Sequence, residues 1–309
     1  MVAGLAVPGA GGAATGGGPL VAAAGDISCS VARTKTERVN PLRCKQRETS
    51  DLLVGGGYRA ILALGDLMQN LHPDLRDYRR SYLPTWGRFK ERTFPAIGNH
   101  DYGFRDGKGY FDFFNGVGDP RGRAGIRGRG WYSFDLGRWH LVSLNANCGR
   151  PDVSCGPGSP QLEWLRRDLA RHPSRCTLAF WHQPRFSSGA HGNDERVSAF
   201  WRVLYAAGAD VVLNGHDQLY ERFAPQTPRG EVDRRRGIVQ FTVGTGGEAL
   251  FEFRRIKRAS RARQNSTFGI LRMRLAGGGF RWAYLAAPGG EALDKGHRRC
   301  HGPADRSPG

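Results

Sequence analysis

The sequence predicts an α/β protein in which two mixed β-sheets pack face to face between outer helices, a four-layer α/β/β/α sandwich. Three observations support this fold class: apolar runs recur along the chain, helical patterns fall between them, and the C-terminal third is rich in strand patterns. Continuously apolar strands are typical of sheets that helices cover. No internal repeat or long linker divides the body, so we expect one domain over residues 20–302, between tails at 1–19 and 303–309.

Five apolar runs end abruptly in residues that can bind a metal ion or transfer a proton. In open α/β sheets, functional groups collect at the carboxyl ends of the strands. We therefore expect the side chains that follow these runs to lie close together. The runs are residues 19–26 (PLVAAAGD), 60–66 (AILALGD), 94–101 (FPAIGNHD), 176–184 (CTLAFWHQP) and 209–217 (ADVVLNGHD).

Helices are expected in two segments between these runs. Residues 159–172 offer Ser159 as an N-cap and Pro160 at the first helical position, followed by leucines spaced along one face. Residues 195–208 form a second candidate helix, which Gly208 would end.

Antiparallel strands are expected in the remaining ordered segments. Residues 131–146 alternate in polarity and turn at Leu136-Gly137, which is typical of a β-hairpin. Further strands are expected within residues 237–247, 269–275 and 280–287.

The excess of basic residues could mark a polyanionic partner or merely an arginine-rich proteome, and we favour the second interpretation. The chain has 46 Lys and Arg against 28 Asp and Glu, giving a net charge of +18. The basic residues are scattered, and no nucleic-acid-binding motif accompanies them, so nucleic acid is not expected to be the partner. A positive field would help to attract a phosphate-bearing substrate. No apolar stretch of about 18 residues is present, so no membrane span is expected.

The six cysteines indicate disulfide bonds and an oxidising compartment. No C-x-x-C pair suggests a zinc site. Cys29 and Cys44 are close in sequence, as are Cys148 and Cys155, which would leave Cys176 to pair with Cys300; buried free thiols in a cytosolic protein are the alternative. We expect an extracellular or cell-envelope location, although residues 1–19 lack the basic and unbroken apolar regions of a signal peptide.

The polar residues at the five strand ends form an ordered set. A single Gly-Asp after a strand is usually a turn, and a single histidine is usually a core or surface residue. Five strand ends that supply carboxylate, carboxylate, amide, imidazole and imidazole instead indicate a metal site. The set is Gly25-Asp26, Gly65-Asp66, Gly98-Asn99-His100-Asp101, His182 and Gly215-His216.

With this order of GD, GD, GNHD, H and GH-x-x-x-YER, the sequence resembles the calcineurin-like metallophosphoesterase superfamily, and within it the purple acid phosphatase-like branch, over about residues 20–300. The resemblance implies a metallophosphoesterase domain that hydrolyses a small phosphorylated substrate, with a phosphomonoester expected. It also implies two divalent or trivalent metal ions, Fe, Mn or Zn, and attack by a metal-bound hydroxide. The resemblance does not indicate an oligomeric state.

Carried over by position, the resemblance assigns metal ligands to five residues. Asp66 would bridge the two ions, and Asp26 would serve the first. The second ion's remaining ligands would be Asn99, His182 and His216.

The resemblance also implies residues that act on the substrate. His100, oriented by Asp101, would donate a proton to the leaving group or bind a phosphate oxygen, unless it only bonds a loop carbonyl. His191 would face the substrate. Arg185 is close enough in the chain to bind the same phosphate, with a surface ion pair as the alternative. Residues 220–222 (YER) would support the preceding loop.

The first metal's ligands are depleted in this sequence. Ser28 stands where many members of the superfamily, though not the purple enzymes, carry a histidine. Gln69 replaces the metal-binding tyrosine of the purple enzymes, and Gln218 replaces the second histidine of the GH-x-H motif. Asp26 and Asp66 are left as the strong ligands of the first metal. A glutamine oxygen is a weak, neutral donor, so the first site should bind metal weakly, prefer harder ions such as Mn or Mg, or stay empty.

Two functional hypotheses follow from this depletion. The first is a working phosphohydrolase with a weak first metal site. The alternative is a catalytically impaired homologue that binds phosphorylated ligands with a single metal. We favour the first, because His100, His191 and the whole second-metal set are present.

Overall fold

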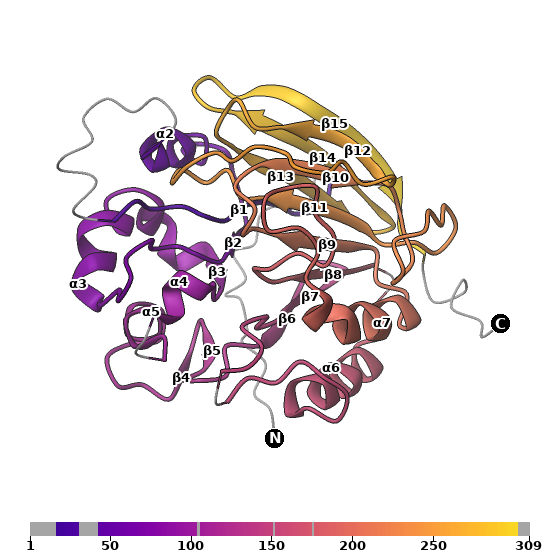
Figure 1. The fold of residues 1–309 in the computed structure, drawn as a ribbon, viewed down its shortest axis with the longest axis horizontal. Helices are drawn as coiled ribbons and strands as arrows, with labels where there is room; N and C mark the ends of the chain where they lie inside the picture. The colour runs from indigo at the N-terminus through magenta and orange to yellow at the C-terminus, as the bar shows by residue number, and fades with distance from the viewer. Residues whose placement is uncertain (1–16, 31–42, 104–105, 151, 175, 302–309) are drawn as a thin grey trace.

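A computed structural model shows the arrangement of these segments in space (Figure 1). Of the expected tails, residues 1–16 and 303–309 lie outside the described residues. The structure describes residues 17–30, 43–103, 106–150, 152–174 and 176–301.

The first large sheet combines strands from both ends of the chain. Its strands β1, β2 and β3 are parallel, and β13 pairs antiparallel with β1. The order in the sheet is β15-β14-β13-β1-β2-β3. The strands are β1 (Leu20–Ala24), β2 (Ala60–Leu64), β3 (Thr93–Ala96), β13 (Gly269–Ala276), β14 (Gly279–Ala286) and β15 (Glu291–Arg299).

The second large sheet has the order β12-β10-β11-β9-β8-β7-β6. Strands β7, β8, β9 and β11 are parallel, and the others pair antiparallel. A short ribbon of β4 (Arg121–Gly122) and β5 (Gly125–Ile126) lies outside it. The strands are β6 (Tyr132–Leu136), β7 (Trp139–Ser143), β8 (Cys176–Phe180), β9 (Val211–Asn214), β10 (Tyr220–Phe223), β11 (Val239–Val243) and β12 (Ser260–Gln264).

Aromatic side chains join the two sheets. The Trp139 indole of β7 donates to the Ala276 carbonyl of β13 at 2.7 Å. Tyr220 of β10 stacks on Tyr284 of β14, with ring centroids 4.2 Å apart. The five expected apolar runs form β1, β2, β3, β8 and β9, and almost every residue in these strands is buried. The predicted fold of two large mixed sheets with helices is therefore confirmed.

Helices lie beside both sheets, with α6 and α7 next to β7–β9 and α3–α5 next to β1–β3 (Figure 1). Short helical turns also occur at Tyr78–Tyr82, Trp86–Arg92 and Glu195–Val197. No described helix has the length and apolarity needed to cross a membrane. The α-helices are α2 (Gln46–Asp51), α3 (Leu75–Asp77), α4 (Asn99–Tyr102), α5 (Lys108–Phe114), α6 (Pro160–Arg171) and α7 (Ser198–Ala206).

The expected local signals match the observed ends of these elements. Ser159 caps α6 by accepting a hydrogen bond from the Leu162 N–H, and Pro160 is its first residue. The second helix, expected from residue 195, opens instead with a 3₁₀ turn before α7, and Gly208 follows it with φ +73°. The hairpin of β6 and β7 turns through Gly137, as expected.

All three expected disulfides are present. They join Cys29 to Cys44, Cys148 to Cys155 and Cys176 to Cys300. The third links the first residue of β8 to the residue after β15, so it connects the two sheets covalently.

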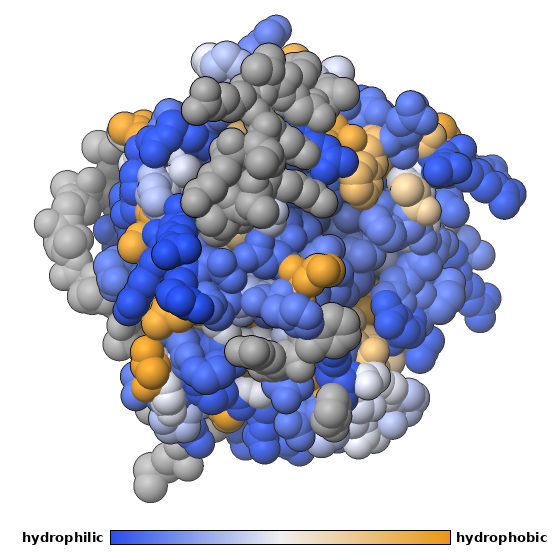
Figure 2. All heavy atoms as spheres, turned by 60° about the vertical axis from the view of Figure 1, so that its left-hand side comes forward, coloured by the Kyte–Doolittle hydropathy of each residue, from blue (hydrophilic) through white to orange (hydrophobic). Residues whose placement is uncertain are grey.

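The face that carries the N-terminal helices is mostly hydrophilic (Figure 2). Its apolar residues are scattered in small groups between polar ones. Small, separate apolar groups of this kind are normal on protein surfaces, so the coloured residues of this face show no broad apolar area for docking.

A buried histidine on β7 is held between two carboxylates. The ring nitrogens of His140 lie 2.7 Å from Asp135 Oδ1 and 2.8 Å from Asp168 Oδ2. Burial alone would lower the pKa of His140, but its bonds to Asp168 and Asp135 outweigh burial and raise it. His140, Asp168 and His172 also have metal-like spacing. Because both nitrogens of His140 already bond carboxylates, we interpret this group as an ion pair.

A His140→Gln variant is expected to show the stabilising effect of this ion pair. A raised folded-state pKa makes the charged histidine stabilising below its unfolded pKa, and this contribution is lost as pH rises through the folded pKa. Denaturant titrations should therefore find the wild type more stable by about 1–3 kcal/mol between roughly pH 4.5 and 6.5, with a smaller difference at higher pH. The exposed His297→Gln control should show no such trend, and a difference that grows with pH would contradict the assignment.

Candidate metal centre

Three of the expected metal ligands occupy the left-handed backbone region. Asp26, Asp66 and His216 follow β1, β2 and β9 with φ of 57°, 49° and 71°. This conformation costs a non-glycine residue roughly 1–2 kcal/mol, and such strain is concentrated at functional sites. The three strand ends thus turn sharply and place a polar side chain where each sheet ends.

Two glycines make room for this arrangement. A Cβ atom on Gly65 would lie 2.5 Å from Nδ1 of His182, and one on Gly98 would lie 2.1 Å from Oδ1 of Asp66. Any side chain at either position would displace an expected ligand. The Gly-Asp and Gly-Asn pairs in the sequence therefore have a steric reason.

The structure brings Asp66, His182 and His216 together, with their ligand atoms within 4.8 Å of one another. Nε2 of His182 lies 3.1 Å from Oδ2 of Asp66. Nδ1 of His182 lies 2.8 Å from the Leu64 carbonyl oxygen, to which it can donate. Metal-binding histidines usually donate their second ring N–H in this way, so the donor set fits a metal ion.

The charges of this group are strongly coupled. Burial would raise the pKa of Asp66, but the His182 and His100 imidazoles outweigh it and lower the pKa. Burial would lower the pKa of His182, but Asp66 raises it to about 9. Burial and the charge of His182 lower the pKa of His216 to about 3, so its imidazole is neutral. A metal ion that binds here must displace the His182 proton.

Asp26 connects the ends of the two sheets. Its Oδ2 accepts a hydrogen bond from the His216 N–H at 2.8 Å. Its buried Oδ1 has no hydrogen-bond partner among the described residues. Burial raises the pKa of Asp26 well above its usual value, although His182 partly opposes this. A buried oxygen without a partner is the expected condition of a ligand atom without its ion.

The three depleted positions also contain buried atoms without partners. These are Ser28 Oγ, Gln69 Nε2 and Gln218 Oε1, within the described part of the chain. Ser28 forms a backbone bridge with Met68, so the loops after β1 and β2 run side by side there. All three side chains are uncharged, so the carboxylates of Asp26 and Asp66 would be the strong donors of the expected first site.

Asp101 does not orient His100, contrary to expectation. Its carboxylate accepts hydrogen bonds from the N–H groups of Leu67, Met68 and Gly98 and from the Tyr78 hydroxyl. This completely buried side chain ties together the loops after β2 and β3.

His100 itself lies beside the expected metal ligands. Its N–H donates to Asp66 Oδ1 at 2.8 Å, and its ring Nε2 lies 4.0 Å from Asp66 Oδ2. The side chain is 38% exposed, so the ring can reach a bound molecule.

His191 has an orienting carboxylate that the sequence analysis missed. Oδ1 of the buried Asp217 lies 3.0 Å from both the backbone nitrogen and ring Nδ1 of His191. The His191 ring is 4.1 Å from that of His216 and remains 45% exposed. The sequence did offer one signal for Asp217, because this residue directly follows the expected ligand His216.

Arg185 does not lie at this centre, contrary to the expectation that it binds substrate. Its guanidinium pairs with Glu195 at 2.8 Å and stacks over Phe186. It lines a separate cavity with Tyr205 and Arg229. The contacts of Arg185 therefore match the alternative given above, a surface ion pair, and not phosphate binding.

The YER residues make two kinds of contact: Tyr220 and Arg222 join β10 to β15 of the other sheet, and Glu221 supports a loop of the site. Tyr220 and Arg222 both bond the Asp294 carboxylate. Glu221 accepts hydrogen bonds from the N–H and hydroxyl of Ser188, in the loop that carries His191.

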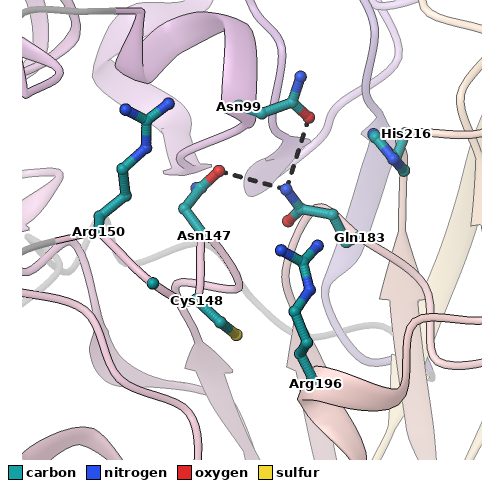
Figure 3. A pocket seen from close by; sticks show the side chains of 8 residues that line it. Asn99, Asn147, Cys148, Arg150, Gln183, Arg196 and His216 are labelled. Carbon is teal, nitrogen blue, oxygen red and sulfur yellow. Dashed lines mark hydrogen bonds between the residues drawn. The ribbon is translucent and has the colours of Figure 1, made fainter.

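A cavity of about 360 Å³ opens beside the expected ligands Asn99 and His216 (Figure 3). The Gln183 amide joins Asn99 to Asn147 through hydrogen bonds of 3.5 Å and 3.2 Å. The other six lining residues were not expected from the sequence, and four of them have polar or charged side chains: Asn147, Arg150, Gln183 and Arg196. Arg150 and Asn147 follow β7, whose end lacks the Gly-Asp or Gly-His pattern.

The two sheets and the cluster at their carboxyl ends define a metallophosphoesterase fold with a candidate metal centre. A family model described as calcineurin-like phosphoesterase matches residues 22–220, more than half of the chain. The chain belongs to the calcineurin-like phosphoesterase family.

Similar proteins include acid phosphatases from plants and animals. Purple acid phosphatase 15 of Arabidopsis thaliana is 31% identical over 175 residues, which are 52% of this chain and 32% of the relative. Acid phosphatase type 7 of Homo sapiens is 27% identical over 263 residues, which are 72% of this chain and 56% of the relative. The chain thus matches only part of the length of these relatives.

Two solved structures share the fold. Purple acid phosphatase PPD1 from yellow lupin (Lupinus luteus) seeds has a TM-score of 0.73 at 18% identity, covering 93% of this chain and 55% of the other. GAP50, the anchor in the inner membrane complex of Plasmodium, has a TM-score of 0.67 at 13% identity. This match covers 92% of this chain and 89% of GAP50.

Proposed function

We propose that this protein is a metal-dependent phosphohydrolase that removes phosphate from a small phosphomonoester. The observation that carries the proposal is the group of buried Asp66 and His182 with partly buried His216, beside a cavity of small-molecule size. Similarity to acid phosphatases supports the same reaction class.

Asp66, Asn99, His182 and His216 would hold one metal ion, and Asp26 with Asp66 would hold a second. Bound metal ions supply positive charge that polarises a phosphoryl oxygen and lowers the pKa of water. In the overall reaction, a water oxygen bonds to phosphorus, the bond to the leaving oxygen breaks, and that oxygen receives a proton.

His191 and His100 are the groups of this chain proposed to act on the substrate. The contact between Asp217 and Nδ1 of His191 leaves Nε2 of that ring for a phosphate oxygen or the leaving oxygen. His100 lies on the Asp66 side of the centre and His191 on the His216 side. Together they would bind the phosphoryl group and deliver the proton.

We propose that the two metal positions differ in affinity. The second position would have two imidazoles and a shared carboxylate, whereas Ser28, Gln69 and Gln218 would give the first position only neutral side chains. The first ion would therefore bind weakly and be filled at raised concentrations of a hard ion such as Mn. Fe, Mn and Zn all suit the second position.

The alternative is a single-metal protein that binds phosphorylated ligands without efficient turnover. The neutral side chains at Ser28, Gln69 and Gln218 favour it. GAP50 shares the fold and is described as an anchor, so an anchoring or binding role is compatible with this architecture.

The test measures bound metal and the hydrolysis of 4-nitrophenyl phosphate as Mn, Fe or Zn is added to metal-free protein. We expect one metal to bind tightly per chain, with turnover rising as the second binds. Tight phosphate binding with one metal, and no turnover at saturating metal, would instead establish the single-metal alternative.

Residues 20–302 are proposed to act as one metallophosphoesterase domain in an extracellular or cell-envelope location. The three disulfides support this location, because such bonds persist in oxidising compartments.

A further inference from the structure

We propose that Arg150 binds a second anionic group of the substrate, so that the preferred substrates carry another phosphate or carboxylate on the leaving group. This inference rests on the proposed phosphohydrolase function and concerns the selectivity of the same cavity. It starts from the position of Arg150 in the cavity wall with Asn99 and His216.

The Arg150 guanidinium is available for a ligand. It lies over the Tyr102 ring, 5.3 Å from the centroid, and the residue is only partly buried. Within the described ranges, no carboxylate lies within ion-pair distance of it, and it makes no side-chain hydrogen bond. Stacking fixes the plane of the guanidinium and leaves its N–H groups free for an anion.

Arg196, the other arginine of the cavity, is in a different state. Its guanidinium forms hydrogen bonds of 3.0 Å and 2.7 Å to the two carboxylate oxygens of Asp194. This pairing neutralises Arg196, whereas Arg150 keeps its positive charge. Figure 3 shows the two arginines on different sides of Asn147 and Gln183.

The backbone that carries Arg150 is held in place. The Cys148–Cys155 disulfide closes the loop around it, and the Arg150 N–H donates to the Asn147 carbonyl. The Asn147 amide donates to the Ile97 carbonyl at 3.0 Å, which ties this loop to the segment before Asn99. Arg150 is therefore positioned relative to the candidate metal centre before any ligand binds.

The composition of the cavity wall favours an anion with two charged groups. Among the described residues that line it none is acidic, and their polar groups are amides, an imidazole and guanidiniums. One phosphoryl group would lie at the Asn99 and His216 end, and the second anion would lie at Arg150. A guanidinium can bind either phosphate or carboxylate through two N–H groups.

The test compares glucose 6-phosphate with glucose 1,6-bisphosphate, using metal-loaded wild type, Arg150→Ala and Arg150→Lys. We expect wild type to have a kcat/KM about tenfold higher for the bisphosphate, mainly through KM. Arg150→Ala should lose this preference but hydrolyse the monophosphate within about twofold of the wild-type rate. Arg150→Lys should keep part of the preference for the bisphosphate. The exposed Arg166→Ala variant, which removes the same charge from α6, should behave as wild type.

An equal loss for both substrates in Arg150→Ala, or no loss for either, would overturn the proposal. If no variant hydrolyses either sugar phosphate, the phosphohydrolase proposal fails separately, and calorimetric binding of the same two ligands then decides the role of Arg150. Tighter bisphosphate binding that Arg150→Ala abolishes would support it, and equal binding of both ligands would reject it.

Discussion

An Asp66→Asn variant is expected to lose bound metal and phosphatase activity together. Asp66 is the carboxylate that faces His182 and accepts the His100 N–H, and it is the proposed ligand of both metal ions. The asparagine keeps the shape but removes the negative charge. We expect a fall in kcat of roughly 10²–10³-fold or more, of the size seen when one electrostatic contact to a transition state is removed. Initial rates and metal analysis by mass spectrometry measure the two effects.

An Asp119→Asn variant is the matched control for this experiment, because Asp119 is exposed and far from the proposed ligand set in the sequence. It should keep its metal and its rate. Asp66→Asn protein that stays folded and retains full activity would contradict the assignment of Asp66 as a shared ligand.

A Gln218→His variant is expected to gain metal affinity at the first site. The Gln218 amide oxygen is buried and has no partner within the described residues, so an imidazole at this position would supply a stronger donor to the proposed first site. Substituting a residue that hydrogen-bonds a metal ligand changes metal affinity by about 10–100-fold. Adding a direct ligand should change the affinity at least as much. The metal concentration for half-maximal activity should fall by that factor.

Gln218→Asn controls for this substitution, since it keeps an amide and adds no imidazole. It should show no gain in affinity. If Gln218→His alone turns an inactive wild type into an active enzyme, the single-metal alternative describes the natural protein. If the variant leaves the metal titration unchanged, Gln218 is not a position of the first site.

The sequence predicted the main elements because their signals are local. Ser159 and Pro160 mark the start of α6, and apolar runs followed by Gly-Asp mark the ends of β1 and β2. The disulfides followed from the close spacing of two cysteine pairs. The second-metal group could also be expected, because functional groups collect at the carboxyl ends of the strands in such folds. Its residues come from both sheets, since Asp66 follows β2 of the first and His182 and His216 follow β8 and β9 of the second.

The contacts of Asp101, Arg185 and Arg150 could not be read from the sequence in the same way. Asp101 is adjacent to His100 in the chain, but at the start of a helical turn successive side chains point in different directions, and its carboxylate faces the loop after β2. Arg185 follows the strand end closely yet turns towards Glu195. Arg150 reaches the cavity through a loop whose path depends on Tyr102 and a disulfide.

The left-handed backbone at Asp26, Asp66 and His216 has a consequence for engineering this protein. Glycine adopts that conformation without the cost that a β-carbon brings. A selection for heat resistance alone would therefore favour glycine at the very positions that are proposed to bind metal. Variants should therefore be screened for heat resistance and phosphatase turnover together. The substitutions that relieve the most backbone strain would also remove the proposed metal ligands.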